Sequence, residues 1–379
     1  MKKRIVYIVG DLSYPNGMSR VLSQKVNYLA EHTDYEMYVV LTENASLPHY
    51  YGLSPKVRYV NFDINFEVVQ TMPLHRKVWN YYWKTRQYRR ELSNYLIRVR
   101  PNITVSVLRR EINFINDIHD GSKKIGEIHF NRQSYRVFNK SFLPSFLNRY
   151  ITKKWKDSLD KQVRRLNHFV VLTHEDESMW EGFRNISVIP NPIILFPKVQ
   201  SDCTSHHVIA VGRYTWQKGF DMLIKSWKII YQKHPDWVLD IYGAGDRQAY
   251  SEQVEREGLS SVIICHGVEA DIFSKYAESS IFVLSSRYEG FGLVIIEAMA
   301  TGVPIVSFSC PCGPKDIITN GVDGILVENG NIEKMAESIC YLIENVHARK
   351  DMGRRGIISA ERFREDRIMQ KWIELFNGL

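Results

Sequence analysis

Two kinds of hydrophobic pattern alternate along the chain. Short runs of consecutive apolar residues favour buried parallel strands, whereas apolar residues that recur every three or four positions are typical of helices. Because strands alternate with helices, the first half is predicted to form a parallel sheet. Its predicted strands are residues 5–9, 37–41, 103–107, 124–128 and 168–172, and a helix is predicted at 20–29.

The same alternation begins again after residues 188–192, where two prolines interrupt any regular element. The chain is therefore predicted to be an α/β protein with two Rossmann-like domains, residues 1–191 and 192–359, whose parallel sheets face each other across a cleft. A ligand is expected in that cleft, at the carboxyl ends of the strands. Residues 360–379 hold an amphipathic helix that is expected to pack back on the N-terminal domain. The second series predicts strands at 207–211, 237–242, 261–265, 281–285, 304–308 and 324–327, and helices at 220–231, 246–257, 272–277, 292–300 and 332–345.

Composition fits a folded chain with two domains of ordinary size. The sequence has 379 residues, of which 44% are hydrophobic and 24% are charged, as in average globular proteins. No apolar run is long enough for a membrane span, and the short run behind the basic start is unlike a secretory signal. Five cysteines at irregular spacing indicate neither a zinc site nor a disulfide framework. We therefore expect a protein of the reducing cytoplasm.

Positive charge is concentrated in the first half. Residues 1–195 hold 30 Lys and Arg against 18 Asp and Glu, whereas the remainder holds 20 against 24. Two basic belts, residues 76–110 and 132–165, hold ten cations each, and the first interleaves them with Trp and Tyr. Such a segment fits an anionic membrane surface as well as it fits a solvated helix with a buried aromatic face. Nucleic acid is not expected as a partner, because no nucleic-acid-binding motif accompanies the charge.

The segment from Glu289 to Glu297 predicts an anion site. A strand ends at residue 285, and the turn Gly290-Phe291-Gly292 lets the backbone approach a ligand before a helix begins with free N–H groups. Glu297 lies about one turn into this helix, where a carboxylate accepts hydrogen bonds from vicinal hydroxyls. Glu289 precedes the helix, close to the far side of the anion. This turn alone is a weak signal, because Gly-x-Gly between a strand and a helix is common.

Two cations are expected at the same cleft. Arg213 follows the strand 207–211, and Lys218 precedes the next helix. Each of them alone also fits a solvated surface residue. Together with the glycine turn, the two cations favour a site that neutralises a diphosphate.

Five motifs of the second half, in this order and spacing, resemble the GT-B glycosyltransferases of family 4. The resemblance extends over the whole chain but is thinner in the first half. The motifs are Gly212-Arg213 with Lys218-Gly219, Tyr242-Gly243-Ala244-Gly245, Ser286-Arg287-Tyr288-Glu289-Gly290-Phe291-Gly292 with Glu297-Ala298-Met299-Ala300, Gly302-Val303-Pro304, and Asn320-Gly321 with Gly324-Ile325-Leu326-Val327.

The resemblance implies a retaining transfer of a hexose or N-acetylhexosamine from a nucleotide diphosphate sugar, without a metal or another cofactor; a UDP-sugar is the favoured donor. Arg213 and Lys218 would neutralise the diphosphate of the departing nucleotide. The turn formed by Gly290, Phe291 and Gly292 would line the donor, and the backbone of Gly292 and Leu293 would add N–H donors. Glu297 would hold the ribose, and Glu289 would hold the hydroxyls of the donor sugar.

In the first half, which the resemblance makes the acceptor-binding domain, Asn16-Gly17 is similar to the family's glycine loop, so Gly17 would contact the donor. The loop departs from the usual Gly-Gly, and Ser19 stands where the family has an acidic residue. Glu127-Ile128-His129 resembles a strand-end segment of the family, so His129 would face the donor sugar. A structural histidine that bonds to a neighbouring carbonyl is the competing interpretation.

The leading hypothesis is a glycosyltransferase, peripheral to the inner face of the cell membrane, that extends a lipid-linked oligosaccharide or a surface polysaccharide precursor. A sugar-nucleotide epimerase and a phosphorylase of the same fold are alternatives within the enzymes. A non-catalytic protein that binds sugar nucleotides or membranes is the alternative outside them. The presence of Arg213, Lys218, Glu289 and Glu297 together argues against this last alternative.

Overall fold

The computed structural model describes residues 2–137 and 144–379, which fall into two compact units. Apart from the residues outside these ranges, the first unit comprises Met1–Leu172, Met179–Ile189 and Met369–Leu379, and the second comprises Thr173–Ser178 and Pro190–Ile368. The basic belt at 132–165 therefore lies partly outside the described residues, at 138–143.

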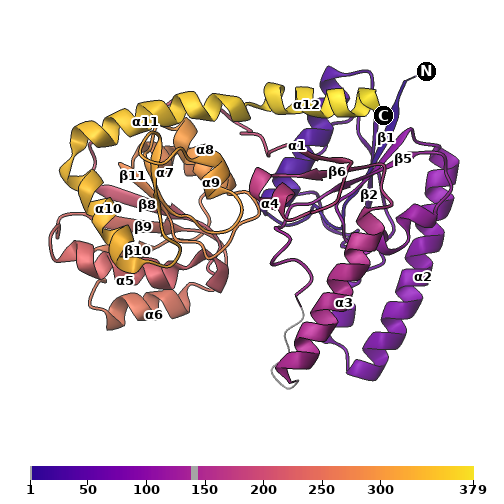
Figure 1. The fold of residues 1–379 in the computed structure, drawn as a ribbon, viewed down its shortest axis with the longest axis horizontal. Coiled ribbons are helices and arrows are strands. Elements are labelled where there is room, and N and C mark those ends of the chain that lie inside the picture. The colour runs from indigo at the N-terminus through magenta and orange to yellow at the C-terminus, as the bar shows by residue number, and fades with distance from the viewer. Residues whose placement is uncertain (1, 138–143) are drawn as a thin grey trace. The chain divides into compact units, whose positions relative to one another are not determined.

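The first unit is built on a seven-stranded parallel sheet, of which Figure 1 labels β1, β2, β5 and β6. The strand order is β3-β2-β1-β4-β5-β6-β7. The central strands are mostly buried, and those next to the middle of the sheet are mainly apolar, which is why their sequence patterns predicted them. Two strands were not predicted, because β3 is largely exposed and β7 has only three half-buried residues. The strands are β1 (Arg4–Ile8), β2 (Glu36–Leu41), β3 (Arg58–Asn61), β4 (Ile103–Ser106), β5 (Lys123–Glu127), β6 (His168–Val171) and β7 (Ile186–Val188).

Long helices accompany this sheet. They are α1 (Gly17–His32), α2 (Leu74–Val99), α3 (Ser145–Val163) and the larger part of α12 (Glu365–Gly378). The C-terminal half of α2 packs into the core through Tyr88, Leu92 and Leu96, whereas its N-terminal half leaves several large aromatic residues exposed. No helix of the described ranges is long and apolar enough to cross a bilayer.

The second unit is a six-stranded parallel sheet in the order β10-β9-β8-β11-β12-β13. Its strands are β8 (His207–Val211), β9 (Val238–Tyr242), β10 (Ile263–Cys265), β11 (Ile281–Leu284), β12 (Ile305–Phe308) and β13 (Gly324–Val327). Its helices are α4 (His174–Ser178), α5 (Phe220–Tyr231), α6 (Gln248–Arg256), α7 (Ile272–Ala277), α8 (Leu293–Ala300), α9 (Pro314–Ile317), α10 (Ile332–Glu344) and α11 (Val346–Ala360).

Helix α4 departs from the expected division of the chain. Residues 173–178 are predicted in the first domain, but they belong to the second unit. The reason lies in α9, whose Asp316 carboxylate accepts hydrogen bonds from the backbone N–H groups of His174 and Glu175 at 2.7 and 3.3 Å. Lys315 adds an ion pair to Glu175 at 2.6 Å.

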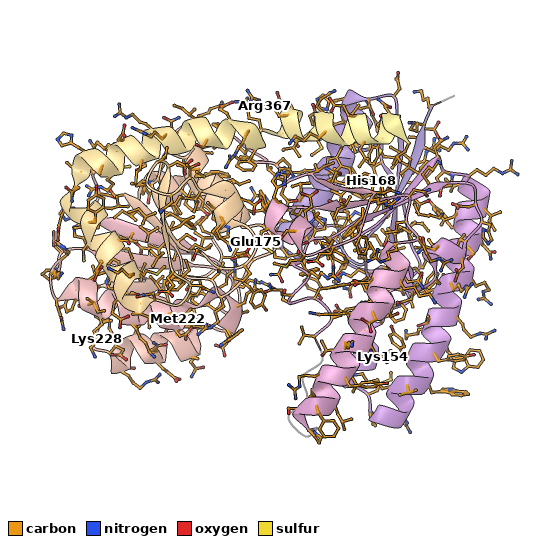
Figure 2. The ribbon with its side chains drawn as sticks, viewed as in Figure 1. Lys154, His168, Glu175, Met222, Lys228 and Arg367 are labelled. Carbon is orange, nitrogen blue, oxygen red and sulfur yellow. The ribbon has the colours of Figure 1, made fainter. Side chains whose placement is uncertain are left out.

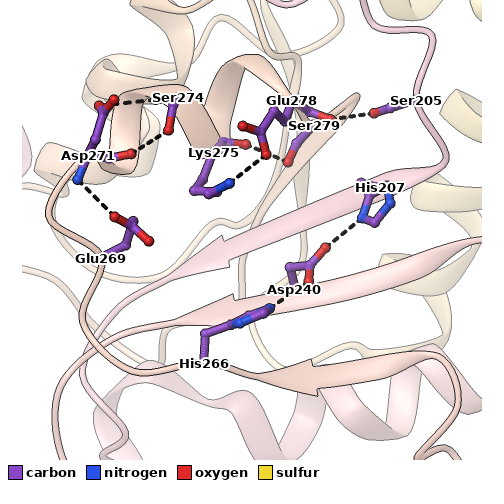
Figure 3. A network of polar contacts seen from close by, with 10 residues as sticks. All are labelled: Ser205, His207, Asp240, His266, Glu269, Asp271, Ser274, Lys275, Glu278 and Ser279. Carbon is purple, nitrogen blue, oxygen red and sulfur yellow. Dashed lines mark hydrogen bonds and ion pairs between the residues drawn. The ribbon is translucent and has the colours of Figure 1, made fainter.

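A polar network ties neighbouring strands of the second sheet together (Figure 3). The Asp240 carboxylate on β9 lies 2.7 Å from His207 Nδ1 on β8 and 2.7 Å from His266 Nε2, directly after β10. The two parallel sheets confirm the predicted α/β class, and in each of them the loops that follow the strands gather at one edge.

Candidate active site

Two loops of the second unit meet because their strands are neighbours. β8 and β11 pair in parallel, so residues 212–219 and residues 285–292 leave the sheet at the same edge. The backbone N–H of Arg287 donates to the carbonyl of Gln217 at 2.8 Å, and Ser285 Oγ donates to the carbonyl of Lys218 at 2.9 Å. These bonds hold the two predicted motifs against each other.

Gly219 is required where the loops touch. Its φ is +65°, in the left-handed region, and a Cβ atom at this position would lie 2.0 Å from the carbonyl oxygen of Ser285. A larger residue would therefore push the loop that carries Lys218 away from β11.

Lys218 and Glu289 form an ion pair at this edge of the sheet. Lys218 Nζ lies 2.6 Å from Glu289 Oε1, and Ser286 Oγ donates to the same oxygen at 2.6 Å. The two side chains are 12% and 7% exposed, so the pair is largely shielded from water but is still reachable. The sequence assigned Lys218 to the diphosphate and Glu289 to the sugar; the structure shows that the two groups touch.

Helix α8 begins directly after this pair. Gly292, with φ +97°, is its N-cap residue, and the first helical residue is Leu293. The first N–H groups of a helix have no partner within it, and the helix dipole is positive there, so this end suits an anion. Gly290 is half-buried, and Phe291 is buried with its ring 5.8 Å from that of Phe363.

The remaining predicted donor residues lie apart from the ion pair. Arg213 is exposed, and among the described residues no hydrogen bond or ion pair holds its guanidinium. Glu297 on α8 is buried, and its Oε2 accepts a hydrogen bond from Tyr276 Oη at 3.3 Å. The structure therefore gives Glu297 a protein partner that the sequence did not indicate.

Cys310 follows β12 close to the same edge. Burial, and then the Glu289 carboxylate, raise the pKa of its thiol. A neutral buried thiol is a poor nucleophile, so the chemistry of this site rests on its cations, carboxylates and backbone N–H groups. Within the described ranges, no group of His, Cys, Asp and Glu is arranged to hold a metal ion.

The predicted residues of the first unit lie after β1 and β5. Gly17 is the first residue of α1, and Asn16 caps this helix by accepting a hydrogen bond from the Ser19 N–H at 2.9 Å. His129 follows β5, with Nε2 3.0 Å from Glu127 Oε1. The group beside this ring nitrogen is therefore a carboxylate.

Glu127 also pairs with Lys25, which the sequence analysis did not single out. A signal was present, because Lys25 stands four positions after Val21 and three after Leu22, on the apolar face of the predicted helix. A cation at such a position is almost always paired.

A cavity of about 140 Å³ opens at the same edge of the first sheet, between the ends of β1, β2 and β4. The strand order reverses direction between β1 and β4, which is where ligands bind in open α/β sheets. Asp11, Asn16, Glu43 and Arg110 line it, and Arg110 Nη1 lies 3.6 Å from Glu43 Oε1. The sequence did not reveal this cavity, because its walls come from five separate segments.

Parts of the chain are similar to a known protein family and to known proteins. Residues 205–345 match the family model described as Glycosyl transferases group 1. An uncharacterized glycosyltransferase of Haemophilus influenzae is 33% identical over 223 residues, which is 55% of this chain and 61% of that protein. The poly(ribitol-phosphate) alpha-N-acetylglucosaminyltransferase of Staphylococcus aureus is 28% identical over 257 residues, 66% of this chain and 52% of that protein. The chain thus matches about half to three fifths of the length of these two relatives.

The solved structure of Anabaena HepE in complex with UDP is similar over its whole length. Its TM-score is 0.73 at 18% sequence identity, with all of both chains covered. This similarity, together with the two parallel sheets, shows that the fold is GT-B, as the sequence predicted. The group 1 match lies within the second unit, which carries Lys218 and Glu289.

Proposed function

We propose that the protein is a retaining glycosyltransferase that moves a sugar from a nucleotide diphosphate sugar, with UDP-sugars favoured, to a lipid-linked oligosaccharide or a surface polysaccharide precursor. The observation that carries the proposal is the Lys218–Glu289 pair in front of the N-terminus of α8. The UDP complex of HepE and the polymer-glycosylating relative of Staphylococcus aureus support the donor and the acceptor class.

In this reaction the diphosphate competes with Glu289 for Lys218. A diphosphate at the start of α8 gains the Lys218 ammonium, the exposed Arg213 and the backbone N–H groups of Gly292 and Leu293. The Glu289 carboxylate then becomes available to the hydroxyls of the donor sugar, while Glu297 takes the ribose. The site lowers the barrier by positioning the sugar and stabilising the departing nucleoside diphosphate.

The first unit supplies the acceptor contacts in this proposal. The carboxylates of Asp11 and Glu43 and the guanidinium of Arg110 line its cavity, and such groups pair with the hydroxyls of a sugar. In the same proposal, the His129 side chain faces the reacting side of the donor sugar.

Transfer is measured as nucleoside diphosphate released from a panel of UDP-, GDP- and ADP-sugars in the presence of bacterial lipid extract. We expect one donor to turn over with the wild type, and a loss of about 100-fold or more with Lys218→Ala, because one stabilising charge contributes roughly 3 kcal/mol to such a transition state. Lys228→Ala is the matched control, since Lys228 lies on α5 of the same unit and is exposed (Figure 2).

An unchanged rate for Lys218→Ala contradicts the assignment of the diphosphate. The anomeric configuration of the product, read from its proton NMR couplings, separates retention from inversion. Conversion of the donor sugar without any acceptor would instead indicate an epimerase.

We also propose that the protein binds the surface of an anionic membrane, and this proposal rests on two helices of the first unit. The N-terminal half of α2 exposes Trp79 and Trp83, at 64% and 50%, and the guanidinium of Arg86 lies 6.0 Å from the Trp83 ring. Aromatic rings interleaved with cations suit the interface of an anionic bilayer. On α3, which carries Lys154 (Figure 2), the exposed large residues are Phe146, Leu147, Tyr150 and Trp155.

Binding is measured by co-sedimentation with phosphatidylglycerol vesicles and with neutral phosphatidylcholine vesicles. Arg86→Glu/Arg90→Glu should weaken binding to the anionic vesicles by more than about 30-fold, because each cation near the surface contributes roughly 1 kcal/mol. The control Arg354→Glu/Arg355→Glu makes the same charge change on the exposed side of α11. Equal binding by both double variants would contradict a membrane surface on α2.

A further inference from the structure

A second buried ion pair lies in the first unit, at the end of β5. Lys25 Nζ on α1 is within hydrogen-bonding distance of Glu127 Oε1, and the two side chains are 2% and 0% exposed. Trp372 of α12 covers the ammonium, which lies 3.9 Å from the centroid of its ring. Tyr7 on β1 also lies against it, with its ring centroid 5.8 Å away.

The stability of the fold does not explain why the Lys25–Glu127 ion pair is buried. Removing both charges from water is costly, and an apolar pair of similar volume is often as stable as a buried ion pair or more stable. The pair also leaves polar atoms without hydrogen bonds, since Glu127 Oε2 and Tyr7 Oη are buried and have no hydrogen-bond partner among the described residues.

The remaining neighbour of the carboxylate is His129. Its Nε2 lies 3.0 Å from Glu127 Oε1, the same oxygen that Lys25 contacts, and its side chain is only 4% exposed. The angle at Nε2 does not complete a hydrogen bond in this structure, as is common for functional groups without their ligand. A carboxylate beside one ring nitrogen favours the tautomer that carries the proton there.

The charges of the cluster support this arrangement at neutral pH. Burial alone would raise the pKa of Glu127, but the charge of the neighbouring Lys25 ammonium, more than any other group, lowers it to about 2. Burial lowers the pKa of Lys25, against the opposing effect of Glu127. Burial, and then Glu127, raise the pKa of Tyr7, so the phenol stays neutral.

We propose that Glu127, neutralised by Lys25 beneath Trp372, is the positioning residue that fixes the ring orientation of His129 and keeps its proton on Nε2. His129 Nδ1 is then the ring nitrogen left to accept a hydrogen bond from a ligand. The consequence for turnover rests on the proposed function, in which His129 serves the donor sugar, whereas the tautomer of His129 does not depend on it.

The test uses the full chain labelled with ¹⁵N-histidine, in which long-range ¹H–¹⁵N spectra report which ring nitrogen carries the proton. The His129 signals are assigned with His129→Asn. In the wild type we expect one tautomer, protonated on Nε2. The variant Lys25→Met/Glu127→Leu removes both charges together and leaves no unpaired one, so the chain should fold. In this variant we expect a mixture of tautomers and turnover lowered by about 10- to 100-fold.

A matched control uses the other buried Lys–carboxylate pair on β5. Lys124 pairs with Asp120 near the opposite end of the strand, with side chains 8% and 1% exposed. Lys124→Met/Asp120→Leu should leave the His129 signals and turnover unchanged. Glu127→Asp retains a carboxylate and should restore most of the Nε2 tautomer.

The outcomes separate the two claims. If Lys25→Met/Glu127→Leu folds and His129 keeps its single tautomer, the positioning role is wrong. If the tautomer changes and turnover does not, Glu127 orients a histidine that the reaction does not use, and the inference fails for catalysis. If the wild type transfers no sugar, the proposed function fails, and the NMR result still decides whether Glu127 positions His129.

Discussion

A Lys–Glu pair lies at the carboxyl edge of each sheet, and the two pairs differ in how far their side chains are exposed. Lys218 and Glu289 are 12% and 7% exposed, whereas Lys25 and Glu127 are 2% and 0% exposed. A diphosphate can reach the first pair and replace one partner of the ammonium. The second pair is enclosed, so its charges stay together and act on the neighbouring ring of His129. In our two proposals, a Lys–Glu pair therefore exchanges a partner with a ligand in one unit and orients a histidine in the other.

The Glu127 carboxyl predicts an acid dependence of stability. Its pKa in the folded chain is about 2, below the ordinary value of 4.5. A lowered carboxyl pKa contributes stability that is present above pH 4.5 and is lost as the pH falls towards 2. The stability difference between the wild type and Glu127→Gln, measured by urea unfolding, should therefore be largest at pH 6 and shrink below pH 4.5. A difference that is constant from pH 6 to pH 3.5 would show that folding does not shift the pKa of this carboxyl.

At the scale of elements, the loops after β8 and β11 make the site. Lys218 and Glu289 are 71 positions apart, and they meet only because the two strands are neighbours in the sheet. Gly219 allows the contact, because any Cβ at this position would collide with the Ser285 carbonyl.

Gly219→Ala tests this contact against Gly330→Ala. Both glycines have positive φ, +65° and +83°, but no atom lies within 4 Å of the Cβ position at Gly330. The strained backbone alone should cost roughly 1–2 kcal/mol in each variant. Gly219→Ala should lower the free energy of unfolding, measured with urea, by more than the cost of the strained backbone. It should also weaken nucleotide binding. Equal losses in the two variants would mean that the contact between the loops does not depend on Gly219.

The elements of the chain differed in how far the sequence could predict them. Buried strands such as β1 and β8 are continuous apolar runs, so their pattern identified them. α11 was not predicted, because its apolar residues are few and its helical spacing is obscured by charged residues. The motif residues of the second unit were found because they are local in sequence. Lys25 and the cavity beside Arg110 depend on packing between distant segments, which no local pattern reports.

At the scale of the whole molecule, the chain returns to the first unit at its C-terminal end. Met369–Leu379 belongs to that unit, and Trp372 and Phe376 are buried in it. Lys3 Nζ also donates to the carbonyl of Phe376 at 2.5 Å. The C-terminal segment is thus part of the structure that encloses Lys25.

Truncation of the chain after Ile368 should destabilise the first unit but not the second. Loss of one buried Trp or Phe side chain costs about 3–5 kcal/mol, so the unfolding of the first unit should move to clearly lower temperature in calorimetry. The unfolding temperature of the second unit should not change, and a bound nucleotide should raise it by as much as in the full chain. A single transition that shifts as one would contradict this division of the chain.

The most direct test of the central claim is nucleotide binding at the Lys218–Glu289 site. Thermal unfolding is followed with UDP, GDP and ADP and their sugar conjugates, on the wild type, Lys218→Ala and Lys228→Ala. A ligand at 100 times its Kd stabilises the folded state by about 2.7 kcal/mol. We predict that one nucleotide diphosphate stabilises the wild type and Lys228→Ala but not Lys218→Ala. Stabilisation of all three proteins to the same extent would contradict the claim that Lys218 holds the diphosphate.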